Sequence, residues 1–224
     1  MLMGQNAATA EPKAARGRAA YFIYTSMPEG VENPATILTG KDTQELILSK
    51  RAASTAVKIP ADGILRLVRK LEAPPAPGEL PYQIIAQAVI PETVTQALVI
   101  LVPIKPTPEG LLFQCKVQDL AAFKGGDYFF LNLTKANIAV DMGATKIPLK
   151  PGHSSIFDAP VTKDPVNMPI RYSYYDEERK EWNVISASTV VLYDTRREIC
   201  IFSWDQVYDR IDYHGITVPV DKQP

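Results

Sequence analysis

The chain has 224 residues, which is enough for one large domain or two small ones. Hydrophobic residues make up 46% of it and charged residues 22%, a globular composition that excludes wholesale disorder. The formal net charge is −1, from 24 basic and 25 acidic side chains, and this balance disfavours a nonspecific nucleic-acid binder. No run of about 18 apolar residues occurs, so no transmembrane helix is predicted.

Residues 1–18 are polar and rich in alanine and show no apolar periodicity, so we expect a disordered tail. They lack the apolar stretch that a secretory signal needs, but Ala8-Thr9-Ala10 has the small-x-small pattern of a signal cleavage site. Two interpretations fit: a start that is truncated or misassigned, and a simple polar tail. The first is favoured.

From residue 19 onward, short runs rich in Val, Ile, Tyr and Phe alternate with turn residues, which predicts an all-β chain. Turn signals such as Asp62-Gly63 and Gly125-Gly126 separate many of these runs. One helical turn is expected at Asp119–Phe123, with Asp119 as its cap. The predicted strands lie near residues 20–26, 43–49, 55–60, 63–71, 82–90, 96–104, 111–118, 127–133, 137–142, 145–149, 153–158, 168–175, 182–191, 198–205 and 210–218.

Several predicted strands alternate between an apolar and a polar face. In residues 63–71, for example, Leu65, Leu67 and Leu71 share one face. This period of two, with one polar face, is what a two-layer sandwich or barrel needs. Leu98–Val102, by contrast, is apolar on both faces, so this strand is expected to be central.

The chain also resembles itself with a period of roughly 100–107 residues. The matching segments are Tyr21–Thr25 with Tyr128–Asn132, Ile84–Ala86 with Val184–Ser186, and Ala97–Leu101 with Glu198–Phe202. A true duplication predicts two tandem antiparallel β-sandwich domains, at residues 19–118 and 119–224. Because β-strands resemble each other easily, one larger sandwich remains the alternative.

The segment Phe123–Thr134 follows the recurrent pattern F-x-x-G-x-Y-x-F-x-N-L-S, with Thr in the last place. Met142-Gly143, Leu149–Gly152, Trp182 in a hairpin and Arg197 before an apolar strand follow it. This set resembles uncharacterised bacterial envelope β-proteins and is distantly similar to a domain-of-unknown-function family of tandem extracytoplasmic β-sandwiches. The resemblance implies an extracytoplasmic location and a non-enzymatic role, and it brings no catalytic residues.

The cysteine and histidine residues favour structural roles. Cys115 and Cys200 lie 85 residues apart, which is neither a metal-ligand spacing nor a disulfide framework. Both lie in apolar runs, so we expect two free core thiols, with a single long-range disulfide as the alternative. His153, in a turn, and His214, on a polar strand face, are expected at the surface, and no metal site is predicted.

No catalytic motif stands out. Ser154 adjoins His153, but neighbouring residues on a strand point to opposite faces, and no G-x-S-x-G elbow occurs. The acid-rich run at residues 176–181 is expected to be a solvated hairpin loop rather than the carboxylate pair of a glycosidase. No phosphate-binding glycine motif is present. We therefore predict no catalytic residues and no cofactor.

The aromatic residues of the last quarter divide into core and surface candidates. Tyr172 shares a face with Ile170, and Trp204 shares one with Cys200 and Phe202, so both aromatic rings are expected in the core.

Tyr175 and Trp182 flank the charged hairpin and are the best candidates for exposure. Together with Tyr213 they form the predicted ligand-binding set, because an aromatic array on a sandwich face can stack on a sugar ring or anchor a protein.

These observations predict a non-catalytic β-sandwich protein, periplasmic or extracellular, with a structural or partner-binding role. Its expected partner is a protein or glycan of the envelope, with no nucleic acid and no membrane span, and its oligomeric state is left open. A carbohydrate-binding module is the second hypothesis and requires exposed, coplanar aromatic rings. A hydrolase is the third and requires His153 or His214 beside a carboxylate in a concave pocket.

Overall fold

The computed structural model describes residues 17–40, 42–71, 81–160, 164–205 and 208–220. Over these stretches the chain forms β-strands and one short 3-10 helix, η1 (Leu120–Ala122), and no α-helix. The predicted all-β class is confirmed. Among the described residues, no helix has the length and hydropathy to cross a membrane.

The strands before η1 are β1 (Ala19–Tyr24), β2 (Ala35–Thr39), β3 (Asp42–Leu46), β4 (Val57–Lys58), β5 (Ile64–Lys70), β6 (Tyr82–Val89), β7 (Gln96–Pro103) and β8 (Phe113–Asp119). The strands after η1 are β9 (Tyr128–Asn132), β10 (Ile138–Met142), β11 (Thr145–Leu149), β12 (Ser154–Phe157), β13 (Val166–Asp176), β14 (Glu181–Leu192), β15 (Arg196–Asp205) and β16 (Arg210–Pro219).

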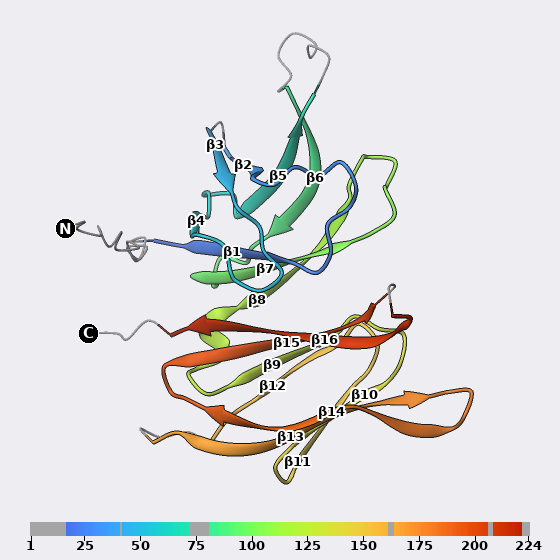
Figure 1. The fold of residues 1–224 in the computed structure, drawn as a ribbon. Helices are drawn as coiled ribbons and strands as arrows, with labels where there is room; N and C mark the ends of the chain where they lie inside the picture. The colour runs from blue at the N-terminus through green and yellow to red at the C-terminus, as the bar shows by residue number, and fades with distance from the viewer. Residues whose placement is uncertain (1–16, 41, 72–80, 161–163, 206–207, 221–224) are drawn as a thin grey trace, which may run out of the picture.

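Each half of the chain is a two-sheet sandwich (Figure 1). In the N-terminal domain, sheet A (β4-β1-β7-β8) packs on sheet B (β3-β2-β5-β6) around buried residues that include Phe22, Leu67 and Phe113. In the C-terminal domain, sheet C (β12-β9-β15-β16) packs on sheet D (β11-β10-β13-β14) around residues that include Phe130 and Phe202. The predicted pair of tandem sandwiches is confirmed, and the chain passes from one to the other at η1.

The two domains have the same strand order, with an offset of eight strands. In each of them one pair is parallel, β1 with β7 and β9 with β15, and the remaining pairs are antiparallel. Residue alternation reports which face of a strand is apolar but not the direction of its neighbour, so the parallel pairs could not be seen in the sequence.

A β-bulge occurs at the same place in both domains. The register shifts between Leu67 and Val68 where β5 pairs with β6, and between Tyr172 and Ser173 where β13 pairs with β14. The bulges fall on Ile84–Ala86 and Val184–Ser186. These two segments were matched to each other when the two halves of the sequence were compared.

For β1 and β9, the first strands of the two domains, the match of Tyr21–Thr25 with Tyr128–Asn132 is displaced by one residue. Ala20 pairs with Ala97, and Tyr128 pairs with Glu198. Since Ala97 aligns with Glu198, the counterpart of Tyr128 is Ala20 rather than Tyr21.

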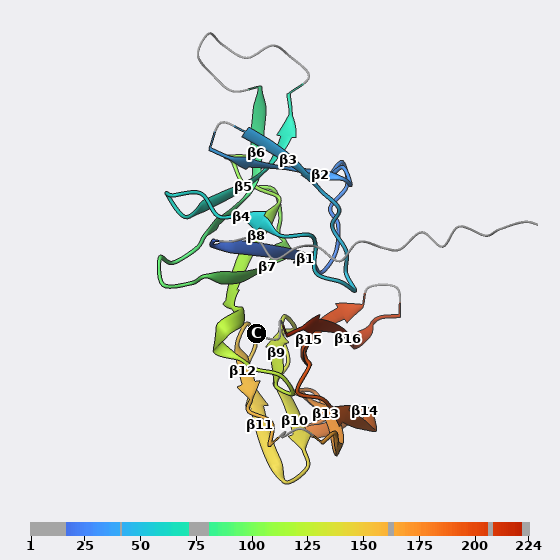
Figure 2. The ribbon, with the colours of Figure 1, turned by 90° about the vertical axis from the view of Figure 1, so that its left-hand side faces the viewer.

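The four sheets stack in the order B, A, C, D, so that sheets A and C face each other (Figures 1 and 2). A third core fills the space between them and joins Leu98 and Ile100 of sheet A to Ile199 and Ile201 of sheet C. Phe123, just after η1, belongs to the same core. The expectation that Leu98–Val102 is central is met, since β7 is covered by sheet B on one face and by sheet C on the other.

Three expectations at the N-terminal end need correction. The short strand β2 was missed, because its five residues lie between Pro34 and Gly40 and read as part of a loop. The strand expected at residues 43–49 ends at Leu46. Arg18 does not belong to a disordered tail, since its guanidinium donates to the carbonyls of Val94, Ile90 and Pro91. Residues 1–16 lie outside the described part of the chain.

The expected helical turn is confirmed as η1. The Asp119 carboxylate caps it by accepting a hydrogen bond from the Ala121 amide at 2.9 Å.

Candidate functional site

Tyr175 and Trp182 lie together at the free end of the β13–β14 hairpin. They are cross-strand partners, and their ring centroids are 5.4 Å apart with the rings tilted by 56°. Tyr174 packs against the domain core, so its neighbour Tyr175 projects from the opposite, outer face of sheet D. Trp182 is 53% exposed. Two of the three predicted binding residues are therefore adjacent and reach solvent.

Val184 extends this patch. It lies two residues after Trp182, pairs with Ser173 across the strands, and is 59% exposed. Alternation along β14 places it on the same outer face as Trp182. Tyr175, Trp182 and Val184 together are referred to below as the hairpin surface.

A charged turn forms the rim of the hairpin surface. The Asp176 carboxylate organises the turn by accepting hydrogen bonds from the amides of Glu178 and Arg179, at 2.9 and 3.1 Å. The Lys180 ammonium lies 3.0 Å from the Glu177 carboxylate, and both side chains are exposed. Such an exposed pair contributes little to stability. The turn is solvated, as expected for residues 176–181.

Tyr213 lies elsewhere. Its ring packs edge-on against Tyr172, with centroids 4.6 Å apart, between sheets C and D. Its hydroxyl donates to Ser186 Oγ at 3.2 Å. The half-buried Tyr213 therefore lies on the inner side of sheet D, whereas Tyr175 and Trp182 lie on the outer side. The three predicted residues do not form one coplanar platform.

Trp204 corrects another expectation. Like Cys200 and Phe202 it lies on the inner side of β15, but it is 52% exposed, whereas Phe202 is fully buried. Trp204 is one residue from the end of β15, where the sandwich no longer covers the strand. Tyr172, by contrast, is buried as predicted.

The two histidines occupy different environments. His153 is exposed in a turn, and its Nδ1 lies 2.9 Å from the Pro151 carbonyl oxygen. His214 is not at the open surface as expected: its Nε2 is buried and has no hydrogen-bond partner in the described structure. The hydrolase hypothesis requires a histidine beside a carboxylate. Within the described residues, neither histidine ring is hydrogen-bonded to a carboxylate.

His214 lies where the two domains meet. It projects from sheet C toward the N-terminal domain, whose Lys50 and Arg51 act on it electrostatically. Burial lowers the pKa of His214, the charge of Lys50 lowers it further, and Asp212 opposes this shift while Arg51 adds to it.

Cys115 and Cys200 are free thiols, as predicted. Burial raises the pKa of each to about 12, so both are protonated at neutral pH. Burial therefore disfavours the thiolate form of both cysteines. Among the described residues, no group of three His, Cys, Asp or Glu side chains is arranged to hold a metal ion.

The segment that carries the recurrent pattern, residues 123–134, is also fixed at two positions that the pattern leaves open, Asp127 and Gly125. Asp127 is buried and accepts hydrogen bonds from the amides of Lys124 and Ala159, both at 2.8 Å. A Cβ on Gly125 would lie 1.6 Å from the Asp194 carbonyl oxygen, so no larger residue fits there.

The asparagine of this pattern, Asn132, is fully buried at the end of β9. Its amide donates to the carbonyls of Ala136 and Leu149, at 2.8 and 3.0 Å, and its oxygen accepts from Thr134. The pattern thus ties the β9–β10 connection to β11, and its polar side chains do not face solvent.

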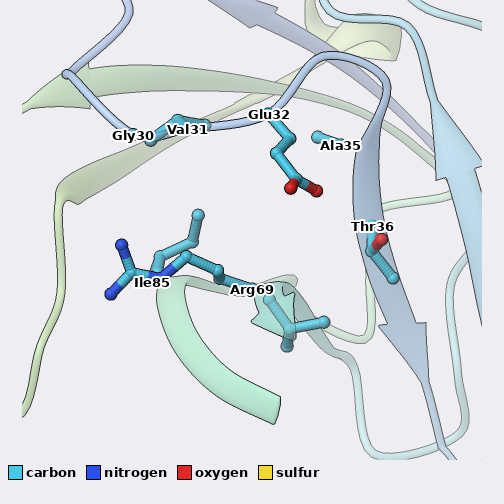
Figure 3. A pocket seen from close by; sticks show the side chains of 8 residues that line it. Gly30, Val31, Glu32, Ala35, Thr36, Arg69 and Ile85 are labelled. Atoms are coloured by element: carbon cyan, nitrogen blue, oxygen red, sulfur yellow. The ribbon is translucent and has the colours of Figure 1, made fainter. Parts of the chain in front are cut away.

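The N-terminal domain has a shallow hollow lined by Gly30, Val31, Glu32, Ala35, Thr36, Val68, Arg69 and Ile85. In Figure 3 the Glu32 carboxylate and the Arg69 guanidinium lie at opposite sides of it. Arg69 donates to Gln83 Oε1 at 2.6 Å rather than closing on Glu32. The hollow encloses roughly 240 Å³ including open solvent, which is below the usual range of ligand pockets.

No protein-family model matches the chain, and a search of curated proteins finds no match.

Proposed function

We propose that the chain is a non-catalytic, extracytoplasmic β-sandwich protein that binds a protein partner of the envelope through the hairpin surface. The observation that carries the binding role is the exposure of Trp182 beside Tyr175 and Val184 on the outer face of sheet D. A contiguous apolar patch with a polar rim is typical of a protein interaction site, and tryptophan is enriched among residues that dominate binding energy.

The protein partner is favoured over a glycan by the geometry of the rings. A sugar-stacking platform needs coplanar aromatic faces, whereas Tyr175 and Trp182 are tilted by 56° and Tyr213 is on the other side of the sheet. A tilted pair of half-exposed rings forms an uneven surface, which fits a pocket or ridge of a protein.

The extracytoplasmic location rests on the resemblance to envelope proteins and on the cleavage-like Ala8-Thr9-Ala10 sequence, which lies outside the described residues. The matching strand orders and the shared bulge support descent of both domains from one duplicated unit. We include this tandem repeat in the proposal.

Binding of the chain to immobilised envelope proteins tests the proposed role. We expect Trp182→Ala to weaken binding at least tenfold, since about 1.4 kcal/mol accounts for a factor of ten and a dominant interface tryptophan contributes more. Trp204→Ala is the matched control, because Trp204 is equally exposed but lies at the end of the β15–β16 hairpin.

Equal binding by the wild type and Trp182→Ala contradicts the proposal, as does equal loss in both tryptophan variants. If the chain instead binds a glycan array in a way that requires Trp182, and does not bind envelope proteins, the carbohydrate-binding alternative replaces the proposed protein-binding role.

A further inference from the structure

No described residue pairs with the outer edge of β14 in sheet D, whereas the equivalent edge in the other domain is covered. β14 is the last strand of its sheet, and within residues 17–40, 42–71, 81–160, 164–205 and 208–220 its strand partner is β13. β6 is likewise the last strand of sheet B, but the segment before β8 runs along it, and the Leu112 amide donates to the Ile85 carbonyl at 2.8 Å.

The lengths of two connections explain this difference. Nine residues, 104–112, join β7 to β8, and they reach across to β6. Only four, 206–209, join β15 to β16, and the described residues of the C-terminal domain include no equivalent segment beside β14.

The exposure of equivalent side chains confirms that the β14 edge is open. Ala86 and Ala88 on β6 are 1% exposed. When the two domains are aligned on their bulges, the equivalent residues of β14 are Ser186 and Ser188. Ser186 is half-buried, and Ser188 is exposed. A hydrogen bond from the Tyr213 hydroxyl of β16 to the Ser186 hydroxyl of β14 joins the two strands.

The open edge also lacks the usual protection against strand pairing. Its regular part after the bulge is Ser186–Leu192, which contains no charged residue and no proline. Natural edge strands are normally blunted by lysine, proline, a bulge or a cover. Here the bulge lies before this segment and leaves seven residues in regular register, which is the length of an ordinary strand.

We infer that a second copy of this chain occupies the edge, with β14 pairing antiparallel to β14 of the partner about a two-fold axis at Thr189. Sheets D of the two copies then form one continuous eight-stranded sheet. This inference does not depend on the proposed function, because it uses the edge of β14 and not the hairpin surface.

The sequence of the segment is compatible with pairing to itself. With Thr189 on the axis, Ser188 faces Val190, Ala187 faces Val191 and Ser186 faces Leu192 of the second copy. Each of these pairs thus joins a small residue to a larger apolar one, and no like charges are opposed. An isologous contact of this kind closes as a dimer and leaves no further edge of the same type open.

Charge favours the antiparallel orientation. The turn before β14 carries four acidic and two basic residues at 176–181. Antiparallel pairing about Thr189 places the two acid-rich turns at opposite ends of the paired segment. Parallel pairing would place the two acid-rich turns side by side.

Sedimentation of the full chain over a dilution series tests this assembly. We expect the wild type to have a mass of about 49 kDa, twice the 24.7 kDa of one chain. Thr189→Lys places two like charges on the axis and should give a monomer of unchanged circular dichroism, because Thr189 is exposed. Asn167→Lys is the matched control, since Asn167 is exposed on the same face of β13 but not at the edge, and it should remain a dimer.

Oxidation of Thr189→Cys gives a second readout. Opposed residues of an antiparallel pair have Cα atoms about 4.5–5.5 Å apart, within the range that a disulfide spans. We expect a covalent dimer from Thr189→Cys and none from Asn167→Cys. A monomeric wild type, a dimer that survives Thr189→Lys, or failure of Thr189→Cys to cross-link in a dimeric sample overturns the inference.

Discussion

Buried polar side chains hold the C-terminal domain together at its connections. Arg197 is 6% exposed, and its Nη1 donates to the carbonyls of Leu120 and Phe123 while the guanidinium lies over the Phe123 ring. A charge-assisted hydrogen bond is stronger than a neutral one, particularly away from water. Arg197 therefore fixes the segment that joins the two domains, as Asn132 fixes the connection after β9.

His214 makes the stability of the protein depend on pH. Its pKa in the folded protein lies below the ordinary value, so the unfolded chain takes up the proton first as the pH falls. The contribution of neutral His214 is complete above the unfolded-state pKa of about 6.5 and is lost as the pH falls toward the folded-state pKa.

We expect the free energy of unfolding, measured with urea, to decline from about pH 7.5 to pH 5 and to decline less in His214→Gln. His153→Gln is the control, because His153 is exposed. If His214→Gln follows the wild-type profile, the decline belongs to other groups.

At the scale of single elements, exposure and not residue type decides what an aromatic side chain contributes. Phe130 on β9 is fully buried between sheets C and D, whereas Trp182 on β14 is half exposed on the outer face. Truncating a buried aromatic ring removes its transfer free energy and leaves a cavity, but truncating an exposed ring does neither.

We therefore expect Phe130→Ala to lower the free energy of unfolding by about 3–5 kcal/mol. Trp182→Ala should lower it by less than about 1 kcal/mol, mainly through the lost cross-strand contact with Tyr175. Chemical denaturation of both variants measures the difference. A loss of several kcal/mol in Trp182→Ala would mean that the hairpin surface is part of the core.

On the scale of the whole molecule, the apolar contact between sheets A and C joins the two sandwiches. Leu98, Ile100, Ile199 and Ile201 are each fully buried in the core between them. Neither domain can unfold without exposing the apolar face of its neighbour, and that exposure is costly. The two domains should consequently behave as one cooperative unit.

Calorimetry should show a single unfolding transition for the full chain. Leu98→Ala and Ile201→Ala should each lower the free energy of unfolding by about 2–5 kcal/mol and shift that single transition as a whole. Val89→Ala is the control, because Val89 is 61% exposed. Two separate transitions, of which each variant moves only one, would show that the domains unfold independently.

Much of the fold could be predicted from local patterns. Alternation of apolar residues located most strands, Asp119 predicted the helical turn, and the two-sided apolar run at Leu98–Val102 identified a central strand. The exposure of Trp182 beside the charged turn was also predicted, because hairpin ends carry the charges that stay in water.

Only the tertiary structure decided what covers each strand. Trp204 lies on an apolar face yet projects past the end of the sandwich, Tyr213 is separated from Tyr175 by sheet D, and β14 is open where β6 is covered. The physical reason is that residue alternation is a local property, set by the pleat of the strand. Pairing direction, sheet stacking and edge coverage depend on connections between residues far apart in the chain.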